Sequence, residues 1–309
     1  MLREEYTQVK VKKIGVLVNA VMLGVSLLFV LYIVHASWNQ LQLYFKYLNY
    51  WLLAFAILIY PLGFLPLLMM WHKIMSYIGG CHDLYTNIRL YSLSCLPKRL
   101  PGTVWYISSR VALYQECQVK PAITLMATFI ETICLTFSGF SISLLVGTTS
   151  ALFSQGKGIV ICLLLLPLAF PMWGLLARRG FGPQERKGLM MIIDKFNLRS
   201  ALLLLGISVL AWTGGGLLLY ILSNAVTEVP MTRLPSVIGI WSGAGAFSLS
   251  VGLLAQGLGL REVALTALLA YEMPLPAAAI VSLLFRLLLT LGEPLWALVA
   301  AWLAHKAAK

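Results

Sequence analysis

Long runs of apolar residues dominate this chain and alternate with shorter charged segments. The runs cover residues 14–35, 51–71, 121–146, 158–177, 200–222 and 276–303. An α-helix rises about 1.5 Å per residue and the hydrocarbon core of a bilayer is about 30 Å thick, so about 20 apolar residues cross it. The pattern therefore predicts about six transmembrane helices in an all-α polytopic membrane protein.

Two segments between these runs are too long and too apolar to be ordinary connections. Residues 83–117 and 235–272 each contain two apolar pieces, separated by LPKRLPG in the first segment and by GLG in the second. We expect neither piece of either segment to cross the bilayer alone. Two short helices around a Pro or Gly break are typical of a re-entrant hairpin, which dips into the membrane and returns to the side it left.

Composition and charge place these elements in a membrane. Hydrophobic residues make up 60% of the chain and charged residues 11%, a balance that excludes an ordinary soluble domain. Of the 23 Lys and Arg residues, 18 lie in residues 1–13, 72–120, 178–199 and 304–309. Because cytoplasmic segments are enriched in Lys and Arg, we expect a multi-pass protein of the cytoplasmic membrane with both termini in the cytoplasm. The net charge of +12 then reflects topology and attraction to anionic lipid, so no nucleic-acid partner is expected.

The two halves of the chain repeat one order of elements in opposite directions through the membrane. Residues 51–146 hold a span, the hairpin 83–117 and a second span. Residues 200–303 hold the same order around the hairpin 235–272. The charge distribution places the first hairpin on the cytoplasmic side and the second on the outer side. We therefore predict an inverted-topology repeat within a single membrane domain of residues 1–309.

Opposite charges lie at the same depth in the last spans of the two halves. Glu131 follows Pro121 by ten residues, and Arg286 follows Pro276 by the same number. Ten residues correspond to about 15 Å of helix, the middle of the bilayer. The preceding hairpins carry the opposite signs, Arg110 and Glu262. Because charges at this depth are costly without partners, we expect these groups to meet at one central site; the alternative, that they are only structural ion pairs, stays open.

The breaks of the two hairpins are predicted to bind an anion, with phosphate the first choice. The second helix of each hairpin is expected to begin near Thr103 or Leu260, and helix N-termini favour anions. Glycines allow close backbone approach, and the arginine guanidinium binds phosphate in a bidentate way. The predicted substrate-binding residues are Arg99, Gly102, Arg110, Glu131, Gly257, Gly259, Arg261, Glu262, Arg286 and Glu293.

The sequence contains no pattern typical of catalysis, metal binding or cofactor binding. The four histidines lack metal-ligand spacing, the five cysteines lack a CxxC pair, and nucleotide-binding and hydrolase motifs are missing. We therefore expect no enzyme activity, no metal and no cofactor. Movement of a lipid would then run downhill or be driven by an ion gradient, with Glu131 as the best candidate for a proton carrier. Trp71, at the end of a span, is expected in the aromatic belt at the membrane surface.

Three segments together resemble a known family. LPGTVWYISSR with an acidic residue in the next span, GLGLREVALTALLA and FRLLLTLGE are similar to segments of the lysylphosphatidylglycerol synthase transmembrane family. This family includes the flippase-like membrane domain of the bacterial multiple-peptide-resistance factor and its stand-alone relatives. The similarity covers nearly the whole chain, with Ala255-Gln256 before Gly257 where family members have a Pro-Gly pair. Because the sequence ends at HKAAK, we expect a stand-alone member without the aminoacyl-transferase domain of the fused enzymes, and the resemblance then implies lipid translocation without the synthetic step.

These observations together predict a flippase for an anionic lipid, with a polyprenyl phosphate that carries a sugar as the first choice. Arg110, Arg261 and Arg286 would hold the phosphate, and Glu131, Glu262 and Glu293 would pair with them when the site is empty. An aminoacyl-phospholipid flippase with a cationic headgroup, of the lysyl-phosphatidylglycerol type, is one alternative. A non-transporting membrane partner of a lipid-modifying enzyme is another. The sequence does not determine the oligomeric state, and it is compatible with a homo-oligomer.

Overall fold

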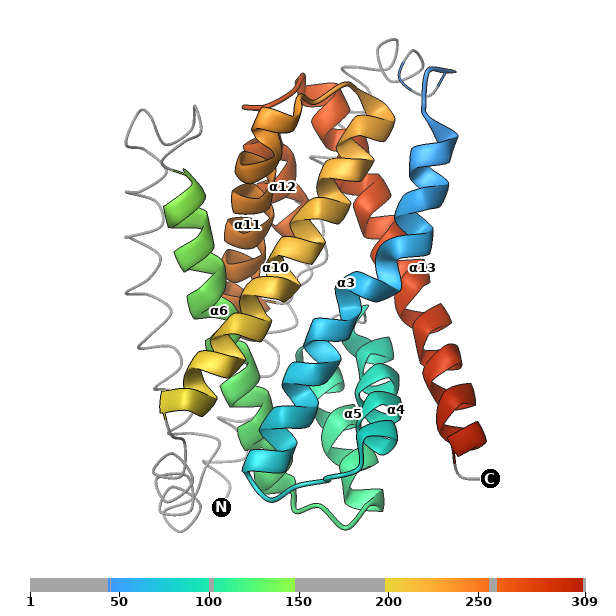
Figure 1. Cartoon of the computed structure of the whole chain (residues 1–309), viewed down its shortest axis with the longest axis vertical. Helices are drawn as coiled ribbons and strands as arrows, with labels where there is room; N and C mark the ends of the chain where they lie inside the picture. The colour runs from blue at the N-terminus through green and yellow to red at the C-terminus, as the bar shows by residue number, and fades with distance from the viewer. Residues whose placement is uncertain (1–43, 45, 100–102, 148–197, 256–259, 308–309) are drawn as a thin grey trace, which may run out of the picture.

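The computed structural model describes residues 44, 46–99, 103–147, 198–255 and 260–307, which form helices and short connections without a strand (Figure 1). In chain order the elements are α3 (Tyr50–Tyr77), α4 (Leu84–Cys95), η1 (Leu96–Arg99), α5 (Thr103–Glu116), α6 (Pro121–Gly147), α10 (Leu198–Val226), η2 (Met231–Arg233), α11 (Leu234–Ala255), α12 (Leu260–Leu269) and α13 (Leu275–Ala307).

Four of the described helices are long and apolar enough to cross a membrane. They are α3, α6, α10 and α13, with apolar stretches at Tyr50–Tyr77, Pro121–Val146, Leu198–Val226 and Leu275–Trp302. They coincide with four of the predicted spans, so the predicted all-helical architecture with apolar helices of membrane-spanning length is confirmed for the described residues. The other two predicted spans, residues 14–35 and 158–177, lie outside the described residues.

Prolines and a capping side chain set where several helices begin. Pro121 is the first residue of α6 and Pro276 the second residue of α13, positions at which a helix does not need the missing N–H. The Asp83 carboxylate caps α4 by accepting a hydrogen bond of 2.7 Å from the backbone N–H of Thr86. Hydrogen bonds from Thr86, from its side chain and its backbone, hold the pKa of the Asp83 carboxyl below its usual range.

The two predicted helix pairs are present, α4–α5 in the first half and α11–α12 in the second. Each pair begins and ends at one end of the molecule, and the two pairs lie at opposite ends (Figure 1). Tyr114, near the end of α5, donates a hydrogen bond of 2.8 Å to Asn87 Oδ1 in the first turn of α4. Arg233 Nη1, just before α11, lies 2.8 Å from Glu272 Oε2, just after α12. These contacts hold the open end of each pair together.

The length of α11 differs from the sequence prediction. This helix has 22 residues, about 33 Å at the usual rise, so it is not a short helix as expected, although it is not among the four helices found long and apolar enough to cross a membrane. Its partner α12 has only 10 residues, as expected for a short piece. The glycines of α11 do not break it because they serve close packing. Gly243 lies directly against the Ser143 side chain, and Gly245 lies directly against the Trp212 ring.

The two halves pack through matching contacts. The first spans, α3 and α10, cross where Gly63 faces Gly214, and a Cβ atom added to Gly214 would lie 3.5 Å from the Gly63 Cα. The first hairpin helix of each half packs along the last span of the other half, α4 along α13 and α11 along α6. Each second hairpin helix packs on the last span of its own half, α5 on α6 and α12 on α13.

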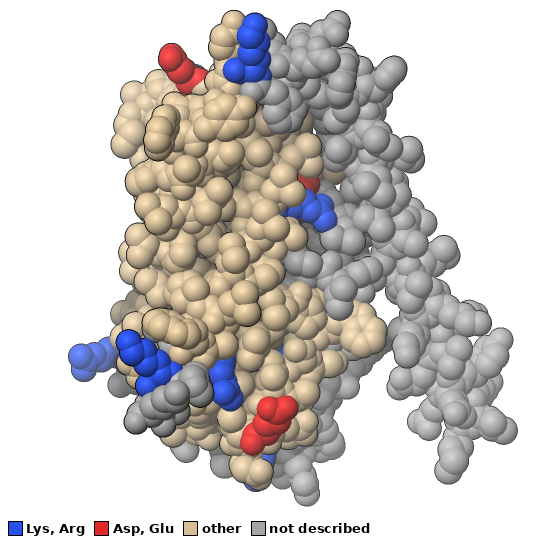
Figure 2. Space-filling view, turned by 90° about the vertical axis from the view of Figure 1, so that its right-hand side faces the viewer, with Lys and Arg blue, Asp and Glu red and all other residues tan. Residues whose placement is uncertain are grey.

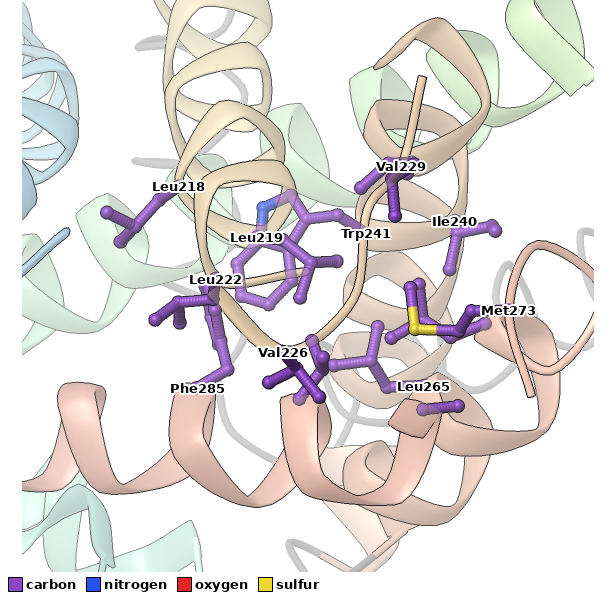
Figure 3. Close-up of a cluster of buried hydrophobic side chains, with 14 of the residues drawn as sticks. Leu218, Leu219, Leu222, Val226, Val229, Ile240, Trp241, Leu265, Met273 and Phe285 are labelled. Carbon is purple, nitrogen blue, oxygen red and sulfur yellow. The ribbon is translucent and has the colours of Figure 1, made fainter. Parts of the chain in front are cut away.

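The larger apolar core lies where α10, α11, α12 and α13 meet (Figure 3). Leu219 and Leu222 of α10 are fully buried there, beside Trp241 of α11, Leu265 of α12 and Phe285 of α13. The Trp241 and Phe285 rings are 4.4 Å apart between centroids. This cluster fixes α11 and α12 against the spans and so determines where the charges of the second hairpin lie.

We expect Gly216→Ala to lower the free energy of unfolding by about 1–3 kcal/mol, because overpacking displaces neighbouring backbone. A Cβ atom there would lie 2.7 Å from the Ile238 Cα of α11. Gly206→Ala in the same helix is the matched control, since a Cβ atom there would meet nothing within 4 Å. Alanine should raise stability at position 206 by up to about 1 kcal/mol through its helix propensity. Unfolding of both purified variants in detergent measures the difference, and equal stability of the two would contradict the α10–α11 contact.

Candidate functional site

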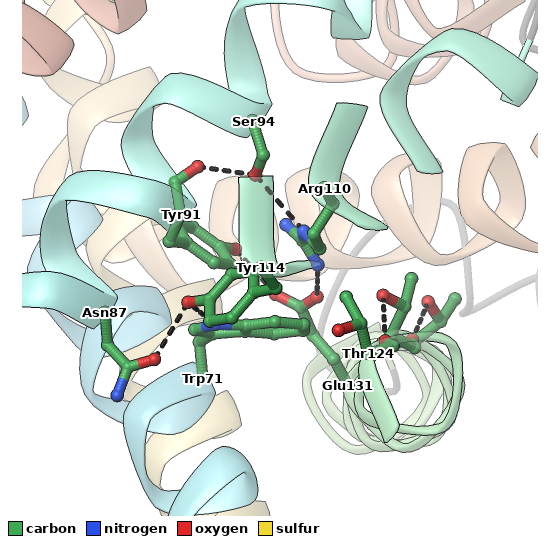
Figure 4. Close-up of polar contacts among 10 residues, drawn as sticks. Trp71, Asn87, Tyr91, Ser94, Arg110, Tyr114, Thr124 and Glu131 are labelled. Atoms are coloured by element: carbon green, nitrogen blue, oxygen red, sulfur yellow. Dashed lines mark hydrogen bonds and ion pairs between the residues drawn. The ribbon is translucent and has the colours of Figure 1, made fainter. Parts of the chain in front are cut away.

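A buried ion pair joins the hairpin α4–α5 to the span α6. Arg110 Nη1 lies 2.6 Å from Glu131 Oε2, and the two side chains are 0% and 4% exposed (Figure 4). The Tyr91 hydroxyl donates a hydrogen bond of 2.6 Å to the other carboxylate oxygen of Glu131. Arg110 Nε donates to Ser94 Oγ at 3.2 Å. Both oxygens of Glu131 are therefore occupied as acceptors, and α4, α5 and α6 are tied at one point.

Three aromatic rings surround the Arg110 guanidinium. Its Cζ atom lies 4.1 Å from the ring centre of Trp71, 4.5 Å from that of Tyr91 and 4.4 Å from that of Tyr106. Such distances allow cation–π attraction, which strengthens when the cation is removed from water. The cage takes one ring each from α3, α4 and α5, so it holds the hairpin against the first span.

The prediction that Trp71 belongs to an aromatic belt at the membrane surface is wrong. Trp71 is fully buried, because its ring face packs against the Arg110 guanidinium. Its Nε1–H donates a hydrogen bond of 2.6 Å to the Tyr114 hydroxyl (Figure 4). A buried indole N–H needs such a partner, and Tyr114 supplies it from α5.

Hydrogen bonds extend from Trp71 to the first turn of α4. Tyr114 accepts from Trp71 and donates to Asn87 Oδ1 at 2.8 Å. The Asn87 amide nitrogen in turn lies 2.8 Å from the Cys81 carbonyl oxygen and 3.1 Å from His72 Nδ1. Because buried Asn87 is held by groups on both sides of it, the network fixes the orientation of the first hairpin relative to α3.

A second ion pair joins the other hairpin to α13, with the signs exchanged. Arg286 Nη1 lies 3.3 Å from Glu262 Oε1, and the side chains are 30% and 15% exposed. Arg261, the residue before Glu262, places its guanidinium 4.0 Å from the ring centre of buried Trp241. Each hairpin therefore carries one member of an ion pair, and the span that follows carries the other.

The structure places the four central charges in two pairs, each within its own half of the chain. Glu131 pairs with Arg110 and Arg286 pairs with Glu262. Figure 2 shows charged atoms at both ends of the molecule and, between them, one group of both signs on a stretch of described surface that is otherwise uncharged. The second pair is partly accessible, whereas the first is enclosed.

The other predicted site residues lie in several places. Glu293 is buried on α13 and lies close enough to Tyr106 of the cage to interact with it electrostatically. Arg99 is the last residue of η1. The helices after the breaks begin at Thr103 and Leu260, as predicted. The three glycines of the breaks, Gly102, Gly257 and Gly259, lie outside the described residues.

Sequence reasoning missed most of the residues around Arg110. They are Trp71, Asn87, Tyr91, Ser94, Tyr106 and Tyr114. A signal was present, since Asn87, Tyr91 and Ser94 follow one another at intervals of four and three residues along α4. On α5, Tyr106, Arg110 and Tyr114 follow at intervals of four. These intervals place each set on one face of its helix.

The site supplies charge and hydrogen-bond donors. Within the described ranges no group of three or more His, Cys, Asp or Glu side chains is placed to hold a metal ion. An anion that reached Arg286 would compete with the Glu262 carboxylate, because both bind the same guanidinium. Glu262 makes a single contact of 3.3 Å, to Nη1, so it is not held tightly in this competition. The arrangement is therefore suited to holding an anionic group.

Within the described residues, the fold has four helices long and apolar enough to cross a membrane, and an arginine–glutamate pair links each hairpin to the span that follows it. Comparison of the sequence and structure with protein-family models, with curated proteins and with solved structures found no match. The family resemblance of the three sequence segments therefore stays a prediction.

Proposed function

We propose that this protein is a lipid flippase that moves an anionic lipid, a polyprenyl phosphate bearing a sugar, across the cytoplasmic membrane. One observation carries the proposal: each hairpin is linked to the next apolar span by an arginine–glutamate pair, with the signs exchanged between the halves. Ionisable residues within apolar membrane helices are expensive, and they commonly mark the path of a polar substrate. The sequence resemblance implies lipid translocation without a lipid-synthesising activity, which agrees with this assignment.

The distribution of surface charge supports the proposed orientation. The α4–α5 hairpin and the C-terminal end of α13 lie at the same end of the molecule (Figure 1). In the described part of the chain this end carries five exposed basic residues. These are Lys73, Arg89, Lys120, Arg199 and Lys306. At the other end, where α11 begins, the exposed basic residues are Lys46 and Arg233. By the enrichment of Lys and Arg in cytoplasmic segments, the α4–α5 end faces the cytoplasm.

The matching contacts of the two halves support an inverted repeat with re-entrant hairpins. Residues 51–146 and 200–303 use the same pairs of elements to contact each other, and their hairpins lie at opposite ends. A hairpin that ends within the membrane leaves backbone groups that must be buried in protein or face water. Such a break therefore provides the polar surroundings that a lipid headgroup needs while its tail stays in the hydrocarbon.

The first pair favours an anionic over a cationic headgroup. A carboxylate within an aromatic cage is an arrangement that binds cations, which an aminoacyl-phospholipid would supply. Here Arg110 already fills that cage and pairs with Glu131. Proton transport through Glu131 would require this pair to open, since Arg110 and Tyr91 donate to both of its oxygens.

A translocation assay in reconstituted vesicles tests the proposed function. The wild-type protein should move a fluorescent short-chain polyprenyl phosphosugar between leaflets, and Arg286→Gln should slow this at least about tenfold through the loss of a charge-assisted contact. Arg199→Gln, at an exposed position outside the pairs, is the matched control and should transport normally. Transport of lysyl-phosphatidylglycerol with no movement of any polyprenyl lipid would refute the proposal in favour of the aminoacyl-lipid alternative.

A further inference from the structure

The two ion pairs differ in how firmly their arginine is held. Arg110 is bound through Nη1 at 2.6 Å and through Nε at 3.2 Å, and three rings pack against it. Arg286 meets Glu262 through Nη1 alone, at 3.3 Å. Charge-assisted hydrogen bonds between such groups are usually about 2.7–2.9 Å long, so the second contact is the looser one.

Accessibility separates the pairs in the same way. The Arg110 and Glu131 side chains are 0% and 4% exposed, whereas Arg286 and Glu262 are 30% and 15% exposed. Arg286 is the twelfth residue of the apolar helix α13, far from either of its ends. A partly exposed arginine at such a depth faces water or an anion in preference to hydrocarbon. The second pair can therefore be reached by a ligand without dismantling the core.

The surroundings of the second pair are also rich in positive charge. Arg261 precedes Glu262 and is held over the Trp241 ring at 4.0 Å. Glu262 lies in the first turn of α12, where the helix dipole stabilises a negative charge. An anionic ligand oxygen that replaced the Glu262 carboxylate at Arg286 would meet the same guanidinium and a similar field.

We propose that the Glu262 carboxylate pairs with Arg286 when the site is empty and is displaced from it when the phosphate of the lipid binds. The ion pair Arg110–Glu131 stays intact throughout and positions the first hairpin. This inference rests on the proposed function, because it takes the ligand to be a phosphate-bearing lipid. It assigns different roles to two pairs that the sequence presents as equivalent.

Binding of farnesyl phosphate to the full-length protein in nanodiscs tests the exchange. Glu262→Gln removes the internal competitor and should tighten binding about tenfold, and Arg286→Gln should weaken it about tenfold. Glu272→Gln and Arg233→Gln are matched controls, because these residues form the other ion pair of the same hairpin, at its open end. Both controls should bind farnesyl phosphate as the wild type does. Inorganic phosphate in place of farnesyl phosphate distinguishes a lipid site from a general anion site, and it should bind at least about tenfold more weakly.

The outcomes separate the inference from the proposed function. If wild type and Glu262→Gln both fail to bind farnesyl phosphate, the proposed function is refuted. If the wild type binds and Glu262→Gln binds equally or more weakly, only the exchange is refuted. Glu262→Asp keeps the charge on a shorter side chain and should give an intermediate affinity. Thermal unfolding of each variant, measured in the same nanodiscs, shows whether a loss of binding reflects a loss of the fold.

Discussion

Glu131→Gln is expected to lower the free energy of unfolding by about 3–5 kcal/mol, because it leaves a fully buried guanidinium without its carboxylate. Arg110 is 0% exposed and cannot turn to solvent when its partner becomes neutral. Ser94 still accepts from its Nε, but a hydroxyl does not compensate a charge. Unfolding of the purified variant in bicelles, followed by steric trapping, measures the change.

Two further variants show whether this loss comes from the uncompensated charge. Arg110→Met combined with Glu131→Met removes both charges and should recover most of the stability, since paired burial of ions is often no better than apolar packing. Glu262→Gln breaks the partly exposed pair of the other half and should cost less than about 1 kcal/mol. Equal losses for Glu131→Gln and Glu262→Gln would contradict the difference in burial between the two pairs.

The positions of the helices follow from local signals that a sequence carries openly. Pro121 is the first residue of α6 and Pro276 the second residue of α13, and within the described residues α4 and α11 end, and α5 and α12 begin, close to the Pro and Gly positions of the sequence. The buried position of Glu131 was also predictable, because Thr124 and Thr128 share its face of α6 and are buried with it. Local propensity and periodicity therefore account for most of the described fold.

The choice of partners could not be predicted in the same way. Glu131 and Arg286 have equivalent positions in the two halves, and depth alone makes them candidates for each other. The structure pairs each with the hairpin of its own half, because α5 packs on α6 and α12 on α13. Which helix faces which depends on tertiary packing over the whole bundle. The length of α11 was missed for a related reason, since glycines that would weaken an isolated helix are stabilised by contacts with other spans.

The cage residues show the limit of single-residue reasoning most clearly. Tyr91 of α4 and Tyr106 of α5 are buried aromatic residues, and single buried aromatic residues of this kind are typical of an ordinary core. Their role becomes visible only when α3 brings Trp71 against the same guanidinium of Arg110. An arginine flanked by aromatic residues at intervals of four on one helix is therefore worth examining as a cage in other apolar sequences.

Trp71→Ala is expected to lower the free energy of unfolding by about 3–5 kcal/mol, because it removes a large buried side chain and leaves a cavity beside Arg110. Trp71→Phe should cost less, since a ring still faces the guanidinium, although the hydrogen bond to Tyr114 is lost. Trp51→Ala is the matched control in the same helix, because Trp51 is 87% exposed, and its effect should stay within about 0.5 kcal/mol. Unfolding in bicelles orders the three variants. If Trp71→Ala lost no more stability than Trp51→Ala, Trp71 would not support the ion pair Arg110–Glu131. If Trp71→Phe lost as much stability as Trp71→Ala, the hydrogen bond to Tyr114 would be the dominant contribution of this side chain.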